Sequence, residues 1–382
     1  MLCSCEKGHL VLMGDKSFCA GVKSEANISR GVVLDCTSTL RTYCWWLNCI
    51  QFHVVASWCS CCLGCICAAD VVALAVVGCH EVEVEADGQE ASFKWEKCQK
   101  NVGHVNFIKP VEFSMSHLPA AHDDDDIYTY IKLWSQLVVR LKVNYISRRR
   151  HQGYAFHNFR GRRTGKVAEI STVTNSPCPC PECRNSNSPK TVWKAIWIMS
   201  AMHVVFDDSE VVETDAELFY DEPDNSDGVR KLHGVRIVDA NIRGDWSKFE
   251  CATHDLELGQ LLEDIDAKVL QLGEIIREKH LAHKFPPLAV IASHPHGCSK
   301  RITVGQWTDR KLVKNPEENY EWTEYVYTTS TCTGCSGAPV WIIGPQRDHY
   351  SYNYYSHVHS EGLKSGLNKS GAGDVEKRWD EN

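Results

Sequence analysis

Residues 333–340 read Thr-Gly-Cys-Ser-Gly-Ala-Pro-Val, and this stretch decides the fold class that we predict for the chain. A serine hydroxyl becomes a useful nucleophile only when a base removes its proton, and the oxyanion formed by its attack needs hydrogen-bond donors. Gly334, two residues before Ser336, permits a tight turn in which the Gly334 and Ser336 amides point toward one spot. Gly337 leaves room beside the hydroxyl, and the Pro-Val pair that follows begins a strand. The segment therefore predicts a nucleophilic serine beside an oxyanion hole.

Two other segments supply candidate partners for this serine. Residues 196–205 (IWIMSAMHVV) form an apolar strand that runs into a turn of small residues and then reaches His203, a candidate general base. Residues 251–258 (CATHDLEL) offer Asp255 as a buried carboxylate that would hold the imidazole in one tautomer. The order along the chain is histidine, aspartate, serine.

These segments resemble the chymotrypsin and trypsin type of serine peptidase. The serine segment is similar to the family's G-x-S-G-x-P-V loop, and the other two are similar to its strand–T-A-A-H and D-[IL]-A-L segments. The order of the three residues is also that of the chymotrypsin type, and differs from the subtilisin and α/β-hydrolase orders. The resemblance implies a serine endopeptidase that acts on a protein or peptide, with His203, Asp255 and Ser336 as its triad and Gly334 and Ser336 as its oxyanion hole.

Departures from the family pattern keep a second reading open. Met202 and Glu257 stand where the family has small residues, and Cys335 precedes the serine. The alternative is a catalytically inactive homologue that binds a peptide or protein.

The residue pattern of 127–382 predicts an all-β domain. Short β-branched and aromatic segments alternate with polar turns that contain glycine or proline, as in an antiparallel barrel or sandwich. The resemblance implies two antiparallel six-stranded β-barrels. Apolar residues at helical spacing predict one inserted amphipathic helix at about 256–281.

The resemblance also suggests where substrate specificity would arise. Ser330 lies six residues before the nucleophile, where an acidic side chain would favour cleavage after arginine or lysine, so that preference is not expected. His359 takes the place of a histidine found in glutamyl-specific relatives, which suggests a pocket for acidic side chains formed by Ser330 and His359. Val204 replaces the cysteine that follows the histidine in animal trypsins, and their amino-terminal activation signature is missing. The chain is therefore closer to the activation-free members of the family.

The charge pattern narrows the class of partner. A formal net charge of −8 argues against nucleic acid as the main partner. The two single-sign runs, Asp123–Asp126 and Arg148–Arg150, are interpreted as solvated loops.

The amino-terminal region is unusual for its cysteines. Of the 20 cysteines, 13 fall within residues 1–98, and residues 1–126 are interpreted as a cysteine-rich region of uncertain fold. Residues 54–79 are apolar apart from Asp70, so a membrane segment is one reading and a poorly ordered cysteine-rich stretch is another. The first residues lack the basic and apolar pattern of a secretory signal, so a cytoplasmic or membrane-associated location is expected. The sequence does not assign an oligomeric state.

Cys178, Cys180 and Cys183 place three thiols within six residues. With a fourth, distant thiolate they could hold a tetrahedral structural zinc ion. A disulfide among them and free thiols are the alternatives. The chemistry predicted for Ser336 needs no cofactor.

Overall fold

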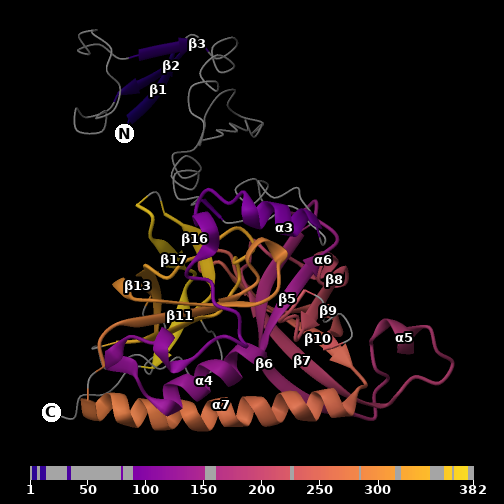
Figure 1. Ribbon diagram of the computed structural model, residues 1–382. Helices are drawn as coiled ribbons and strands as arrows, with labels where there is room; N and C mark the ends of the chain where they lie inside the picture. The colour runs from indigo at the N-terminus through magenta and orange to yellow at the C-terminus, as the bar shows by residue number, and fades with distance from the viewer. Residues whose placement is uncertain are drawn as a thin grey trace. The chain divides into compact units, whose positions relative to one another are not determined.

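The computed structural model describes residues 2–6, 9–13, 32–35, 79–80, 89–150, 161–223, 228–283, 285–314, 320–344, 357–363 and 365–376 (Figure 1). The chain divides into two compact units, Met1–Val77 and Gly78–Asn382. In the first unit, β1 (Leu2–Glu6), β2 (His9–Met13) and β3 (Val32–Asp35) form an antiparallel sheet.

The predicted membrane segment at 54–79 lies outside the described residues except for its last residue, Cys79. None of the helices that the structure describes combines the length and apolar character needed to cross a bilayer. Membrane association stays a prediction.

The second unit begins well before residue 127. Its first elements are β4 (Cys79–His80), α3 (Gln89–Glu96), the 3-10 turns η2 (Val102–His104), η3 (Met115–His117) and η4 (Ala120–His122), and α4 (Asp125–Gln136). Phe113 and Leu118 are buried in the main hydrophobic core, and Ile108 forms a β-bridge with Ile302. The predicted boundary at 126 is therefore corrected, because residues 89–126 supply core and strand contacts to the domain that they precede.

The acidic run at 123–126 has a structural role, which the solvated-loop interpretation missed. The Asp124 carboxylate accepts hydrogen bonds from the Asp126 and Ile127 amides and so caps α4. Lys279 pairs with Asp124 at 2.7 Å and with Asp126 at 2.6 Å, which ties α4 to the helix beneath it in Figure 1.

Six antiparallel strands hydrogen-bond in the closed order β10-β7-β6-β5-β8-β9. They are β5 (Val138–Val143), β6 (Gly161–Thr174), β7 (Val192–Ser200), β8 (Thr214–Leu218), β9 (Arg230–Asn241) and β10 (Trp246–Thr253), with the short helices α5 (Pro181–Arg184) and α6 (Asp208–Val211) between them. Every core position of β5 is apolar, and its two charged side chains are only partly buried, as expected for a strand with one face on a core.

The remaining strands form two further sheets. One has the order β12-β11-β15, from β11 (Leu288–Ser293), β12 (Arg301–Gly305) and β15 (Val340–Ile343), with the 3-10 turn η7 (Pro295–Gly297) between the first two. The other has the order β13-β14-β17-β16-β4, and β18 also pairs with β14. Its strands are β13 (Trp307–Lys314), β14 (Tyr320–Tyr327), β16 (His359–Gly362), β17 (Asn368–Ser370) and β18 (Gly373–Glu376). The prediction of a mostly β, antiparallel domain is confirmed, whereas the two-barrel arrangement stays a prediction.

The predicted amphipathic helix is present as α7 (Leu256–His283). Leu258, Leu262, Ile265 and Val269 bury one face of it in the main core. It lies alongside α4 at the foot of the domain (Figure 1).

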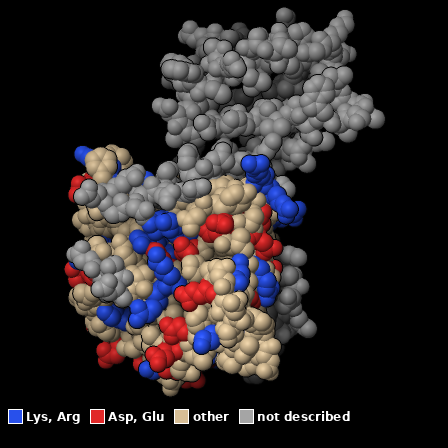
Figure 2. Space-filling model, turned by 90° about the vertical axis from the view of Figure 1, so that its right-hand side faces the viewer, with Lys and Arg blue, Asp and Glu red and all other residues tan. Residues whose placement is uncertain are grey.

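Charged side chains of both signs are interspersed on the face of the second unit seen in Figure 2. The expected absence of a nucleic-acid partner stays a prediction.

Candidate active site

A buried polar contact at the candidate site joins His203 to Asp245. His203 follows the end of β7, and its Nδ1 lies 2.8 Å from Asp245 Oδ2 and 3.0 Å from Oδ1. The His203 amide also donates to Oδ1 at 3.1 Å. Both residues are buried, so the carboxylate fixes the position and the tautomer of the imidazole, leaving Nδ1 as the protonated nitrogen.

The structure places Asp245 beside His203, whereas the sequence analysis expected Asp255 there. Strands β7 and β10 are antiparallel with Ser200 opposite Ser247 and Lys194 opposite Thr253. This register places the start of β10, just after Asp245, beside the end of β7, just before His203. Asp255 follows the other end of β10, and the two ends of this eight-residue strand lie about 24 Å apart at about 3.4 Å per residue.

Asp255 instead directly precedes α7 and caps it. Its Oδ1 accepts a hydrogen bond from the Leu258 amide at 2.9 Å, which is an N-cap contact. The sequence offers only a weak signal for Asp245. Gly244 and Asp245 form a turn-type pair directly before a strand segment, and the pairing of that strand with β7 is what brings this turn to the histidine.

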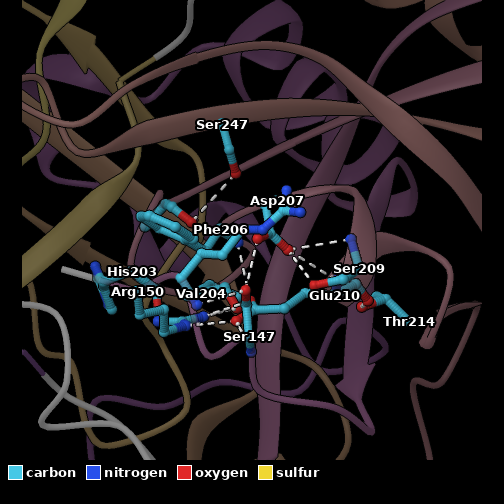
Figure 3. A network of polar contacts seen from close by, with 12 residues as sticks. Ser147, Arg150, His203, Val204, Phe206, Asp207, Ser209, Glu210, Thr214 and Ser247 are labelled. Carbon is cyan, nitrogen blue, oxygen red and sulfur yellow. Dashed lines mark hydrogen bonds and ion pairs between the residues drawn. The ribbon is translucent and has the colours of Figure 1, made fainter.

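A buried ion pair supports the histidine turn from below (Figure 3). The Arg150 guanidinium donates two hydrogen bonds to the Glu210 carboxylate, each at 2.5 Å. It also donates to the carbonyls of His203 at 2.8 Å and Val204 at 3.2 Å. The Phe206 amide donates to the same carboxylate at 2.9 Å. The solvated-loop interpretation of Arg148–Arg150 is thus wrong for Arg150, whose buried guanidinium donates two hydrogen bonds to Glu210 and two to the backbone around His203.

The loop of Ser336 has the backbone conformation that its glycines predict. Gly334 and Gly337 have φ angles of +92° and +82°, in the left-handed region that favours glycine. The Cys335 amide donates to the Cys332 carbonyl, and the Ala338 amide donates to the Cys335 carbonyl. These two bonds hold Ser336 in a tight turn before β15.

Thr164, on β6, connects this loop to the histidine strand. Its amide donates to the Ser336 carbonyl at 3.2 Å, and its hydroxyl donates to the Gly334 carbonyl at 2.9 Å. Its carbonyl accepts the Ser200 hydroxyl at 2.8 Å. A Cβ atom added to Gly337 would lie only 2.1 Å from Ser200 Oγ. The structure therefore brings the predicted nucleophile loop and the predicted base segment together.

Strand β16 completes the connection. The Gly337 amide donates to the His359 carbonyl at 2.8 Å, and the His359 amide donates to the Ala338 carbonyl at 2.7 Å. The next residue, Ser360, donates its hydroxyl to Asp245 Oδ2. The Asp245 carboxylate thus accepts hydrogen bonds from both His203 and Ser360, a role for Ser360 that the sequence analysis did not assign.

The two predicted specificity residues make separate polar contacts. His359 is buried, and its Nδ1 lies 2.8 Å from the Tyr327 hydroxyl. Ser330 Oγ accepts a hydrogen bond from Asn106 at 3.2 Å. Beside Ser330, the Lys100 ammonium donates to the Thr331 hydroxyl at 3.0 Å. A positive charge, which the sequence analysis did not identify, therefore lies beside Thr331, the residue next to Ser330.

Two of the three predicted zinc ligands, Cys180 and Cys183, have their sulfur atoms close to the imidazole of His254. Their Sγ atoms lie 3.3 and 3.5 Å from His254 Nδ1, and Cys178 belongs to the same group of donor atoms. All three thiols are free, so the structure contains no disulfide among them. The fourth member is an imidazole, where the sequence analysis expected a distant thiolate.

No protein-family model and no curated protein sequence matches the chain. Solved structures similar to it include the Rv3671c protease in an inactive form, with 11% identity, a TM-score of 0.31, and coverage of 63% of this chain and 86% of that chain. The active form of the Rv3671c protease from M. tuberculosis has 10% identity, a TM-score of 0.32, and coverage of 63% and 78%.

Proposed function

We propose that the chain is a serine endopeptidase in which Ser336 is the nucleophile, His203 the general base and Asp245 the acid that orients it. The observation that carries this proposal is the hydrogen-bonded pair of His203 and Asp245 at the end of β7, with the Ser336 loop held against the same strand end through Thr164. A peptide or protein is the corresponding substrate.

The mechanism follows from which atoms are already engaged. His203 Nδ1 donates to Asp245, so Nε2 carries the lone pair that removes the proton of the Ser336 hydroxyl. The serine oxygen attacks the scissile carbonyl, and the Gly334 and Ser336 amides are the donors proposed for the oxyanion. His203 then passes the proton to the leaving amine, and water hydrolyses the acyl-enzyme by the reverse sequence.

The test is covalent labelling of the purified full chain with a fluorophosphonate probe. We expect labelling of the native protein and none of Ser336→Ala, with Ser171→Ala, an exposed serine on β6, as the matched control that labels normally. Labelling that survives Ser336→Ala would refute the assignment of the nucleophile.

We further propose that acidic side chains are preferred before the scissile bond. The support is the Lys100 ammonium beside Thr331, together with Ser330 and the buried His359. A peptide library scanned at that position should favour glutamate and aspartate over lysine and arginine, and Lys100→Gln should reduce the preference. A preference for basic side chains in the native protein would contradict this specificity while leaving the endopeptidase proposal intact.

One observation favours the binding-only alternative. Ser336 has no exposed surface and His203 is 2% exposed, so a substrate reaches them only when the atoms that cover them move. An inactive homologue predicts no labelling of Ser336 at any probe concentration and no cleavage in a peptide library. A labelled Ser336 excludes it.

A further inference from the structure

Four residues from distant parts of the second unit bring their donor atoms within 4.8 Å of one another beside the Ser336 loop. We call this group the loop cluster, and it consists of Cys98, His104, His296 and Cys332. Cys98 and His104 come from the segment after α3, His296 belongs to η7, and Cys332 lies four residues before the proposed nucleophile. Two thiols and two imidazoles are a common donor set for structural zinc.

The distances in the loop cluster match those of a tetrahedral zinc centre. With Zn–S and Zn–N bonds of usual length, tetrahedral ligands lie about 3.8 Å apart for two sulfurs, about 3.6 Å for sulfur and nitrogen, and about 3.4 Å for two nitrogens. The observed separations are 3.6 Å for Cys98 Sγ to Cys332 Sγ, 3.4 Å for Cys332 Sγ to His104 Nε2, and 3.2 Å for His104 Nε2 to His296 Nε2. All three agree to within about 0.2 Å.

Hydrogen bonding or a disulfide explains the arrangement of the loop cluster less well than a bound metal ion does. His104 Nε2 faces both Cys332 Sγ and His296 Nε2, and a ring nitrogen has either one proton or one lone pair to offer. The sulfurs of Cys98 and Cys332 are also much farther apart than the about 2.05 Å of a disulfide bond. One cation at the centre satisfies all the donors at once.

The surroundings orient the ligands as neighbouring groups do in known metal sites. His296 Nδ1 lies 3.0 Å from the Thr333 hydroxyl, so the ring's other nitrogen is the one that faces the cluster. The side-chain Nδ2 of Asn101 donates to Cys332 Sγ at 3.1 Å, and the backbone amide of Asn101 donates to Cys98 Sγ at 3.4 Å. The Trp95 ring stacks on His104 with ring centroids 3.7 Å apart and holds it in place.

From this geometry we propose that the loop cluster binds one Zn²⁺ ion with a structural role. The ion would fasten the segment 98–104 to the loop that carries Ser336. The His296 amide donates to the Thr333 carbonyl at 2.6 Å, and a Cβ atom on Gly334 would lie 2.8 Å from the His296 nitrogen, so the cluster adjoins the proposed oxyanion turn. The consequence for activity depends on the proposed function, whereas metal binding itself does not.

The predicted cysteine triplet carries a second, independent site. We propose that the hairpin cluster, defined as Cys178, Cys180, Cys183 and His254, also binds one Zn²⁺. Its sulfur–nitrogen distances of 3.3 and 3.5 Å again fit a tetrahedral centre. His254 Nε2 lies 3.4 Å from the Glu182 carboxylate, the arrangement that orients a metal-bound histidine.

The hairpin cluster is distant from the candidate active site. His254 directly follows β10, whereas Asp245 directly precedes it, so the eight residues of this strand separate the two. Within the described residues these are the two groups of four such donors, and each can serve as the control for the other.

The experiment is metal analysis of the full chain, purified under reducing conditions and equilibrated with zinc. We expect about two zinc ions per chain for the native protein, and about one for either Cys98→Ser or Cys183→Ser. Cys298→Ser changes a half-buried cysteine outside both clusters and should retain both ions. Less than one equivalent in the native protein, or an unchanged content in both cluster variants, would overturn the proposal.

Two further measurements guard against variants that fail to fold. Replacement of zinc by cobalt(II) in the native protein should give the visible absorption of tetrahedral cobalt bound by thiolate, and its absence would also overturn the proposal. Fluorophosphonate labelling should fall in Cys98→Ser and persist in Cys183→Ser, because only the loop cluster adjoins Ser336. If the native protein binds two zinc ions yet never labels, the endopeptidase proposal fails while the metal sites stand.

Discussion

Replacing Asp245 by asparagine tests the most specific result of the structure, the identity of the acid that holds the histidine. An asparagine of the same shape can present its NH₂ group to His203 Nδ1, which would make Nδ1 an acceptor and move the ring proton to Nε2. The base lone pair facing the serine would then be lost. The substitution also removes the negative charge that accepts hydrogen bonds from His203 and Ser360.

The expected loss is large. A wrong imidazole tautomer in a triad costs about 10⁴-fold in rate, equivalent to about 5 kcal/mol of transition-state stabilisation. The assay is the second-order rate constant for labelling of Ser336 by a fluorophosphonate, which needs no knowledge of the natural substrate. Circular dichroism and a thermal melt verify that the variant is folded.

Asp255→Asn is the matched control, because it makes the same chemical change at the residue that the sequence suggested. Asparagine is as good an N-cap as aspartate, so α7 should be retained and labelling should stay within about twofold of the native rate. Native-like labelling of folded Asp245→Asn, with a large loss in Asp255→Asn, would refute the reasoning from strand register.

Three other predictions concern the parts that support the site. Glu210→Gln should destabilise the domain by about 3–5 kcal/mol in urea unfolding, because it leaves a buried guanidinium without its counter-charge, whereas Glu213→Gln, at an exposed position, should have little effect. Gly337→Ala should abolish labelling, because the added methyl would clash with Ser200 Oγ. Gly366 has the same φ of +82° but nothing within 4 Å of an added methyl, so Gly366→Ala should label normally. Equal effects would show that backbone strain and not the clash is responsible. Burial lowers the pKa of His357 to about 4 in the folded protein, so the unfolded chain takes up its proton first as pH falls. This residue should therefore cost up to about 3 kcal/mol of stability as pH falls from about 6.5 to 4. The melting temperature of His357→Asn should fall less in acid than that of the native protein, and equal falls would contradict this.

The segments that could be interpreted from sequence are those whose structure depends on near neighbours. The turn around Ser336 is held by glycine conformations and by hydrogen bonds between residues three apart, so eight letters were enough to predict it. The helix α7 was predicted because its apolar spacing is a local property, and the structure extends it only slightly beyond 256–281. His203 was identified for a similar reason, since it follows an apolar strand and a short turn.

The partners of those residues could not be found in this way, because they depend on which strand ends meet. Asp245 and Asp255 are both aspartates at an end of β10, and only the pairing of β10 with β7 distinguishes them. The burial of Arg150 was hidden for the same reason, since a run of three arginines gives no sign that one of them faces Glu210.

The sequence by itself determined the nucleophile loop, the histidine segment, the mostly β texture and the amphipathic helix, because each is encoded within a few consecutive residues. The tertiary structure decided the acid beside His203 and the fourth member of the hairpin cluster. It also brought together Cys98, His104, His296 and Cys332, which no spacing rule connects. The physical reason is that strand register and the packing of distant segments place these side chains, and both are properties of the whole fold.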